Sequence, residues 1–336
     1  MNRHRTLLLP LALNLILPAC TPVRFAIDIL PAVDSLDETT VMEDEGASSR
    51  SKVAMIDVTG LIVDAPAPGL LVKGENPVAA FVEALQRARD DDGVKAIVIR
   101  LNSPGGTVTA SDVMYREVLH FRDETQKPVV MLMSDLAASG AYYLACAGDT
   151  IIAHPTTITG SIGVIMQLFN FSEGMEKIGI SADAVTSGPN KAMGSPFEPA
   201  QLEHREIFQN MVDEFYSRFR DVVLSNRQIS EADIEWVTDG RIVSGARAAE
   251  IGLVDRTGSL RDAFEEAKAL AGLSSARLVK YHRAYDYVGS AYAAAPAGPP
   301  VAAGQTQVNM IQLNLPSLNE LAQPGFWYLW DPNVEW

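Results

Sequence analysis

The chain has 336 residues, of which 47% are hydrophobic, and carries a formal net charge of −15. This length suits one large domain or two ordinary ones, and the apolar fraction is enough for a substantial core, which excludes a disordered or fibrous protein. The acidic balance argues against a nucleic-acid partner, because phosphate contacts need a basic face.

The first twenty residues have the features of an export signal rather than of the fold. Two arginines precede an apolar run, Leu7–Leu17, and small residues follow it. The run is shorter than the roughly 20 residues that a membrane-spanning helix needs, so a cleaved signal is favoured over an anchor. The sequence Leu17-Pro-Ala-Cys20 resembles a bacterial lipoprotein box in which Cys20 would be lipidated, but Pro18 is unusual there. Lipidation of Cys20 and a plain signal both stay open.

Composition divides the rest of the chain into four parts. Residues 21–51 are acidic and serine-rich towards their end, which predicts a flexible tether. A folded domain is expected over 52–288, followed by an Ala/Gly/Pro-rich mobile linker over 289–307. The last part, 308–336, holds four aromatic residues within Phe326–Trp330. Because this stretch is very apolar for a free tail, we expect it to pack on a groove or on a neighbouring subunit.

Apolar runs alternate with helical patterns through the first half of the domain. Asn76-Pro77 supplies an N-cap and a first-turn proline for one helix. This alternation predicts a layered α/β domain. The expected strands are 52–60, 94–101, a run from 129 and 149–154, with helices over about 77–92, about 109–123 and about 199–227.

Ser139 is expected where the strand from Val129 turns into a helix. The first N–H groups of a helix have no helical partner and carry the positive end of its dipole, so they stabilise negative charge on or beside the serine. A nucleophile and its oxyanion need that environment. The alternative is a serine that merely caps the helix.

Two further loops and one lysine are candidates for the same site. Asn102–Gly106 has two glycines that free its backbone to point N–H groups into a cleft, although an ordinary turn has the same composition. Thr159–Gly163 is a second glycine-flanked serine turn. Lys191 lies in the loop Gly188–Pro196 with no charged neighbour within five residues on either side. The alternative for Lys191 is a solvated loop lysine.

Elimination narrows the chemistry of Ser139. No histidine is placed to serve it, and the sequence has no Gly-x-Ser-x-Gly elbow, no His-Glu-x-x-His metal site and no phosphate loop. If Ser139 is a nucleophile, its base is therefore not histidine. A lysine can be that base when burial disfavours its ammonium form, and the loop around Lys191 suits this role. Cys146, the one cysteine outside the signal region, is expected to be buried and unpaired.

Four motifs in order now resemble the signal peptide peptidase A family, the S49 serine peptidases, in their short single-repeat form. The 52-residue gap between Ser139 and Lys191 matches the catalytic dyad of that family. The resemblance covers about residues 52 to 270, and it departs at Asn190, where the family often has an aromatic residue. The motifs are Ser103-Pro-Gly-Gly106, Ala138-Ser-Gly-Ala-Tyr-Tyr143, Thr159-Gly-Ser-Ile-Gly163 and Gly188-Pro-Asn-Lys-Ala-Met-Gly-Ser-Pro196.

The resemblance implies a ClpP/crotonase-like α/β fold of repeated strand-helix units, assembled into homo-oligomeric rings. It also implies membrane association in the bacterial cell envelope, with the catalytic domain on the extracytoplasmic side, and cleavage of remnant signal peptides without cofactor or metal. Carried over by residue, Ser139 is the nucleophile, Lys191 the general base and Ser161 the group that orients the amine. The backbone N–H groups of Gly106 and Gly140 are the oxyanion donors.

Two other functions remain as alternatives. One is a crotonase-type acyl-CoA enzyme, which would usually need a carboxylate at the reacting carbon and a basic CoA site. The other is a non-catalytic ring scaffold that partitions the membrane. The small residues around Ser139 predict a shallow pocket for small or apolar side chains.

Overall fold

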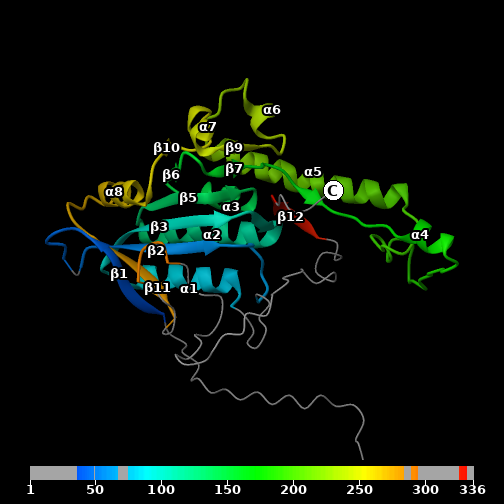
Figure 1. Ribbon diagram of the computed structural model, residues 1–336, viewed down its shortest axis with the longest axis horizontal. Helices are drawn as coiled ribbons and strands as arrows, with labels where there is room; N and C mark the ends of the chain where they lie inside the picture. The colour runs from blue at the N-terminus through cyan, green and yellow to red at the C-terminus, as the bar shows by residue number, and fades with distance from the viewer. Residues whose placement is uncertain (1–35, 49, 67–74, 284–288, 294–324, 331–336) are drawn as a thin grey trace, which may run out of the picture. The chain divides into compact units, whose positions relative to one another are not determined.

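The computed structural model describes residues 36–48, 50–66, 75–283, 289–293 and 325–330, so the signal and lipidation predictions for residues 1–20 lie outside them. Four apolar runs form the parallel centre of the main sheet (Figure 1). Their side chains are buried on both faces, as expected of strands covered by helices on two sides. The α/β prediction is confirmed, and the finer ClpP/crotonase-like assignment stays a prediction. The four strands are β2 (Lys52–Thr59), β3 (Val94–Ser103), β5 (Val129–Ala138) and β6 (Thr150–Ala153).

Shorter strands extend this centre to a nine-stranded sheet in the order β1-β11-β2-β3-β5-β6-β10, with β7 and β9 branching from β5. The branch continues the sheet at the carboxyl end of β5, where Ala138 pairs with Gly160. The added strands are β1 (Asp37–Glu43), β7 (Ile158–Gly160), β9 (Ile242–Ser244), β10 (Arg256–Thr257) and β11 (Arg277–His282).

Helices cover both faces of the sheet. On one face lie α1 (Pro77–Asp90), α2 (Val108–Thr125) and α3 (Gly140–Ala145), which share one core with alternate residues of the strands. The predicted cap of α1 is confirmed, since the Asn76 side chain accepts a hydrogen bond from the Val78 N–H at 2.9 Å. The opposite face is covered by α8 (Leu260–Leu270), whose side chains pack with the other set of strand residues.

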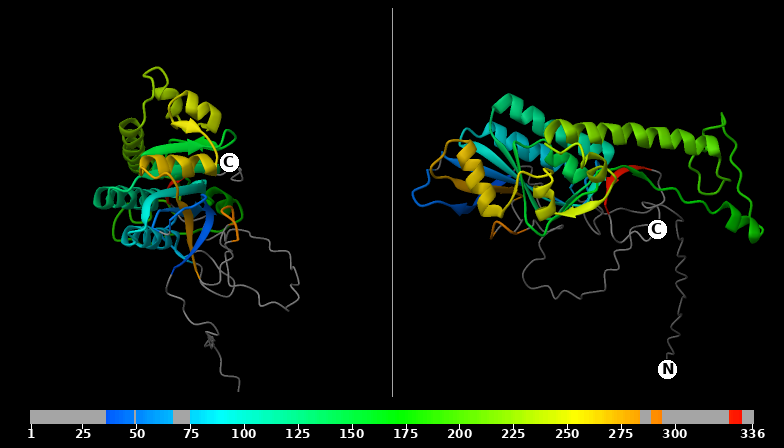
Figure 2. Two further views of the ribbon diagram at one scale, coloured as in Figure 1. Left: turned by 90° about the vertical axis from the view of Figure 1, so that its left-hand side faces the viewer. Right: turned by 90° about the horizontal axis from the view of Figure 1, so that it is seen from above.

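A long helix, α5 (Leu202–Asn226), leads away from this core (Figure 2). Phe219 and Val223 near its end are fully buried in the main core, whereas most of its earlier residues are not. The segment before it, with β8 (Ile165–Met166) and α4 (Ser172–Lys177), extends to the opposite end of the helix (Figure 2). Between α5 and α8 lie α6 (Ile234–Val237) and α7 (Gly245–Glu250). Within the described ranges, none of the helices combines the length and hydropathy of a membrane span.

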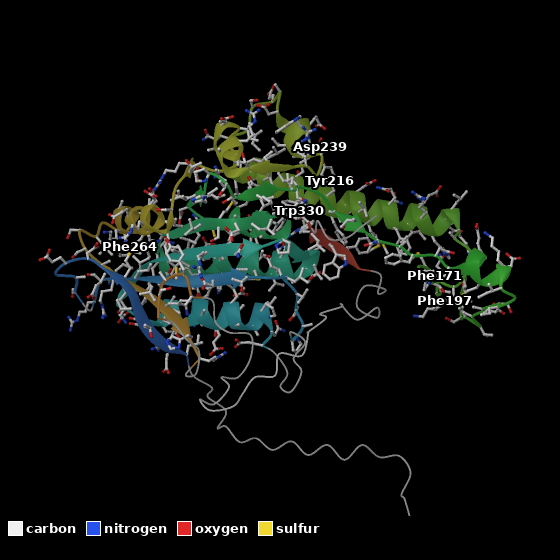
Figure 3. The ribbon with its side chains drawn as sticks, in the orientation of Figure 1. Phe171, Phe197, Tyr216, Asp239, Phe264 and Trp330 are labelled. Atoms are coloured by element: carbon white, nitrogen blue, oxygen red, sulfur yellow. The ribbon has the colours of Figure 1, made fainter. Side chains whose placement is uncertain are left out.

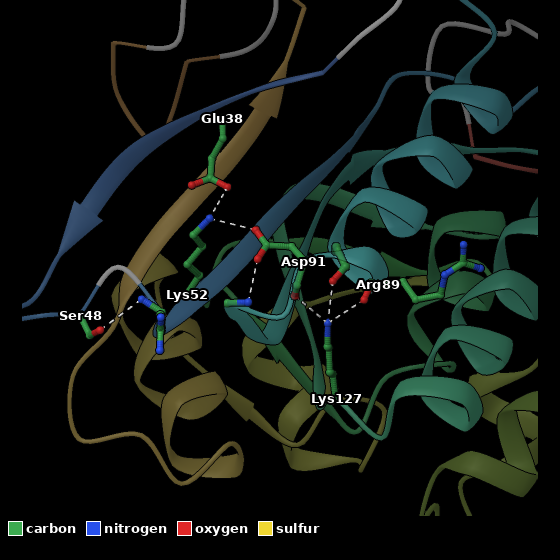
Figure 4. Close-up of polar contacts among 9 residues, drawn as sticks. Glu38, Ser48, Lys52, Arg89, Asp91 and Lys127 are labelled. Atoms are coloured by element: carbon green, nitrogen blue, oxygen red, sulfur yellow. Dashed lines mark hydrogen bonds and ion pairs between the residues drawn. The ribbon is translucent and has the colours of Figure 1, made fainter.

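The predicted tether over 21–51 is wrong for Asp37–Glu43, which forms β1 antiparallel to β11. Its acidic residues are not simply solvated, because they pair with basic residues of the domain. Glu38 contacts the Lys52 amine at 2.8 Å, and that amine also contacts Asp91 at 2.9 Å (Figure 4). Just beyond β1, Asp44 binds the buried Lys268 at 2.7 Å. The domain therefore begins earlier than the composition indicated.

The aromatic end of the chain returns to the domain as β12 (Phe326–Leu329). It is the middle strand of a second sheet, between β4 (Gly105–Thr107) and β8, and it is antiparallel to both. The expected linker over 289–307 is also not wholly separate, because Ala291 is buried and accepts a hydrogen bond from Arg100 at 2.9 Å. The linker beyond residue 293 lies outside the described residues.

Candidate active site

Ser139 lies at the turn between β5 and α3, as predicted, and its backbone is strained. It has φ 54° and ψ −116°, a conformation that residues with a side chain rarely adopt and that costs on the order of 1–3 kcal/mol. Its side chain makes no capping hydrogen bond to α3, so the alternative of a simple cap is wrong. Instead the turn is held by its backbone, since Ser139 N–H donates to Gly160 at 2.8 Å and Ser139 C=O accepts from Tyr143 at 2.9 Å. Strain without a capping role favours a functional serine.

Ser161 lies beside Ser139 on the neighbouring strand. Ala138 and Gly160 are partners in the parallel register of β5 and β7, so Ser139 and Ser161 are the next residue of each strand. Ser161 also has a positive φ, 52°, and its N–H donates to Arg241 at 2.7 Å. The structure therefore brings the two predicted serines together at one edge of the sheet.

Backbone amides of Gly106 and Gly140 converge next to Ser139. A Cβ on Gly140 would lie 3.1 Å from the Gly106 nitrogen and would overlap the buried Ser111 hydroxyl. A Cβ on Gly105, which has φ 102°, would lie 2.7 Å from the Gly140 nitrogen. Because no side chain fits between these segments, both amides are within reach of one small group. This is the geometry that the prediction of two oxyanion donors requires.

An aromatic pocket adjoins these amides, formed by the side chains of Tyr143 and Phe219 and the backbone of Phe215. Tyr143, one turn into α3, has its ring centroid 5.2 Å from that of Phe219. The fully buried ring of Tyr328 from β12 fills the pocket, stacked 5.3 Å from Tyr143 and with its hydroxyl donating to Phe215 C=O at 2.9 Å. The prediction of a shallow pocket is therefore wrong. The small residues flanking Ser139 admit the backbone of a peptide, and the aromatic residues beyond them admit a large ring.

Asp112 fixes Tyr143 within this pocket. The Tyr143 hydroxyl donates to Asp112 at 2.7 Å, and Arg218 and Arg116 donate to the same carboxylate at 2.6 and 2.8 Å. Burial acts to raise the pKa of Asp112, but these hydrogen bonds outweigh it and leave the pKa below its usual value. For Tyr143, burial and then the bond to Asp112 raise the pKa well above its usual value, so the phenol stays protonated.

Sequence reasoning missed the pocket. Phe215 and Phe219 are four residues apart on α5, and Tyr143 belongs to a motif that was recognised only for its serine. Helical spacing indicated an apolar face, but nothing local showed that this face would meet Tyr143. Cys146, by contrast, is buried and free as predicted, and burial raises its pKa to about 12.

Lys191 lies exposed in the segment before α5, and the structure does not bring it to Ser139 of the same chain. The neighbouring Asn190 contacts His204 in the first turn of α5 at 3.1 Å. Phe219, which lines the aromatic pocket, is 15 residues further along the helix, about 22 Å at 1.5 Å per residue. Figure 3 shows the same separation, with Phe171 and Phe197 of this segment at the far end of α5 from Trp330, which follows β12.

No three His, Cys, Asp or Glu side chains gather so as to hold a metal ion in the part of the chain that the structure describes. The groups assembled around Ser139 are hydroxyls, backbone amides and aromatic rings. The fold and this site define an α/β protein with the parts of a serine hydrolase.

Comparisons with known proteins agree with that class. Residues 121–274 match the model of peptidase family S49. A putative protease of Methanocaldococcus jannaschii is 36% identical over 213 residues, which cover 63% of this chain and 68% of that protein. A putative signal peptide peptidase SppA of Enterococcus faecium is 33% identical over 238 residues, or 71% of this chain and 69% of that one. The chain belongs to peptidase family S49.

Longer relatives match over a smaller share of their length. Protease 4 of Haemophilus influenzae is 34% identical over 220 residues, which are 66% of this chain and 35% of that protein. This chain thus spans about a third of the longer relative.

Proposed function

We propose that the protein is a membrane-associated serine endopeptidase that degrades remnant signal peptides or other small membrane-proximal peptides. The observation that carries the proposal is Ser139, strained and without a capping role, beside the converging amides of Gly106 and Gly140. Membership of family S49 supports the same activity. The substrate class rests on the resemblance and on the name of the Enterococcus relative.

In the proposed reaction the Ser139 hydroxyl attacks the peptide carbonyl carbon while the neutral amine of Lys191 takes its proton. The N–H groups of Gly106 and Gly140 stabilise the resulting oxyanion. The tetrahedral intermediate then collapses, the leaving amine takes the proton from Lys191, and an acyl-enzyme remains. Water attacks this ester with Lys191 as base again, which releases the acid and restores Ser139. Ser161 orients the lysine amine.

We further propose that Lys191 serves Ser139 of a neighbouring subunit in a ring. Within one chain α5 separates the two residues, while Lys191 itself is exposed. A head-to-tail contact repeated around a ring can place this segment of each subunit over the Ser139 of the next.

Mixed assembly tests both the dyad and its arrangement. Chains carrying Ser139→Ala or Lys191→Ala should each be inactive. Co-expressed in equal amounts, they should regain about a quarter of wild-type peptide hydrolysis, because a random ring pairs an intact serine with an intact lysine at one site in four. No recovery would mean that the pair acts within one chain, and full activity of Lys191→Ala would remove the lysine from the mechanism.

A fluorophosphonate-type probe separates the peptidase from the two alternatives. It should label the wild-type chain at Ser139 and leave Ser139→Ala unlabelled. A non-catalytic scaffold or an acyl-CoA enzyme would not be labelled at that residue. The probe therefore decides between catalysis by Ser139 and a function that only uses the fold.

For localisation we propose the bacterial cell envelope, with the domain on the extracytoplasmic side. The basic and apolar pattern of the first twenty residues supports export, and Cys20 is the proposed lipidation site. Cys20→Ala should shift the protein from the membrane fraction to the soluble fraction if a lipid holds it. An unchanged distribution would exclude lipidation as the means of attachment.

A further inference from the structure

The strand β12 has the position that an extended peptide would take across the site. It lies between β4 and β8, with Tyr328 opposite Gly106 and Trp327 opposite both Thr107 and Ile165. The pairing continues past the strand, because Trp330 N–H donates to Pro104 C=O at 2.9 Å. Addition of a strand to two exposed edges is a general way in which proteins bind peptides, since main-chain hydrogen bonds supply affinity without regard to sequence.

The carbonyl of Tyr328 points at the two proposed oxyanion donors. Its oxygen would lie 3.1 Å from a Cβ on Gly140 and would overlap a Cβ on Gly105. The same virtual atom on Gly140 is 3.1 Å from the Gly106 nitrogen. Tyr328 therefore occupies the position of the residue whose carbonyl a nucleophile at Ser139 would attack.

The side chains of β12 alternate between the site and the outside. Tyr328 is fully buried in the aromatic pocket, and Phe326, two residues earlier, packs edge-on against Phe215 at 5.1 Å. Trp327 and Leu329 are only partly buried. A strand bound in this way is specified at every second residue, and the main specificity falls on Tyr328.

We propose that residues 326–329 are a resident ligand of the peptide-binding groove, and that the pocket holding Tyr328 selects substrates with a tyrosine-like side chain at that position. This inference rests on the proposed peptidase function. The attached strand competes with substrate at an effective concentration in the millimolar range, so the full-length chain is autoinhibited. Because the Tyr328 hydroxyl donates to Phe215 C=O, the pocket should favour tyrosine over phenylalanine by roughly 2- to 10-fold.

Kinetics of the full-length chain test the proposal. Tyr328→Ala should raise kcat/KM for a short tyrosine-containing peptide by about 10-fold or more, because it weakens the competing strand and leaves the pocket intact. The matched control is Tyr292→Ala, which removes an exposed tyrosine outside β12 and should change kcat/KM less than about twofold. Unchanged or lower kcat/KM in Tyr328→Ala would make β12 a fixed part of the fold and overturn the proposal.

A synthetic peptide with the sequence of residues 324–331 provides the complementary test. It should inhibit the Tyr328→Ala enzyme competitively, and the same peptide with alanine in place of the tyrosine should not. Equal inhibition by both peptides would show that the pocket does not select the ring, and inhibition by neither would show that β12 is not a ligand.

Amide hydrogen exchange separates failure of this inference from failure of the proposed function. In a Ser139→Ala background, which needs no activity, Tyr328→Ala should speed exchange at residues 105–107 and 165–166, and the added peptide should restore protection. Restored protection without hydrolysis by any variant would retain the groove ligand and refute the peptidase. Hydrolysis together with unchanged exchange at both strands would do the reverse.

Discussion

At the scale of single residues, Gly140 is where three segments of the chain meet. Its missing side chain lets the Ser111 hydroxyl, the Gly106 nitrogen and the Tyr328 carbonyl oxygen approach the same point. Gly174, on α4, has open space around it and no unusual φ. The two glycines therefore provide a test of close approach against ordinary helix propensity.

We expect Gly140→Ala to lower the free energy of unfolding by about 1–3 kcal/mol through overpacking, and to abolish most peptide hydrolysis because the donors are displaced. Urea denaturation and peptide kinetics measure the two effects. Gly174→Ala should instead raise stability by about 0.5–1 kcal/mol and leave hydrolysis unchanged. Adding Ser111→Ala to Gly140→Ala should restore part of the stability, and no restoration would contradict the overlap with the Ser111 hydroxyl.

The lowered pKa of Asp112 makes its contribution to stability depend on pH. The carboxylate is stabilised in the fold by bonds from Arg218, Tyr143 and Arg116, so its folded pKa lies below the unfolded value of about 3.8. Its contribution is complete above that value and is lost as the pH falls through the folded pKa. Asp112→Asn should therefore destabilise the protein at pH 7 and less so at pH 3, measured by urea unfolding. Exposed Asp123→Asn on the same helix is the control and should show little difference at pH 7. A gap between wild type and Asp112→Asn that stays constant with pH would contradict this assignment.

The site residues that sequence alone identified are those with a local signature. Ser139 follows an apolar strand, and Gly106 and Gly140 are glycines because their backbones approach other segments closely. The aromatic pocket has no such signature, since it joins Tyr143, Phe219 and Tyr328 from distant parts of the chain. Their contact depends on how α3, α5 and β12 pack, which no spacing in the sequence reveals.

At the scale of elements, β1 shows how an acidic segment can belong to the fold. Composition predicted a solvated tether because acids and serines dominate residues 34–51. The acids are instead partners for basic residues that the domain has partly or wholly buried, with Glu38 on Lys52 and Asp44 on Lys268 (Figure 4). Charge composition does not say where a partner lies, so the prediction failed for physical reasons. The central strands and α1 succeeded because their apolar spacing and cap are local.

Removing β1 should therefore cost stability. A chain that begins at Ser35 should unfold with the same free energy as one carrying residues 1–34. A chain that begins at Lys52 should lose roughly 2–5 kcal/mol, since β11 loses a partner strand and the buried Lys268 loses Asp44. Thermal or urea unfolding of the two chains gives the comparison. Asp44→Asn in the longer chain isolates the ion pair, and equal stability of both truncations would mean that β1 adds nothing to the domain.

At the scale of the whole molecule, the segment before α5 exposes apolar side chains that a lone domain would not need. Phe171 is 52% exposed and Ile178 is 72% exposed, and Phe169 stacks on Phe171 with centroids 6.4 Å apart. Lys191 is exposed on the same segment. Exposed apolar surface of this kind usually marks a contact between proteins, and a neighbouring copy that receives Lys191 at its Ser139 would cover it.

Phe171→Ser combined with Ile178→Ser should therefore convert the proposed ring into smaller species and lower peptide hydrolysis by at least about tenfold, because each Ser139 loses the lysine of its neighbour. Light scattering coupled to size exclusion gives the mass, and peptide kinetics give the activity. Leu270→Ser is the control, since Leu270 is 44% exposed on α8 at the other side of the sheet, and it should change neither. An unchanged mass in the double variant would place the subunit contact elsewhere. A reduced mass with full activity would show that Lys191 reaches Ser139 within one chain, by a movement of the segment along α5.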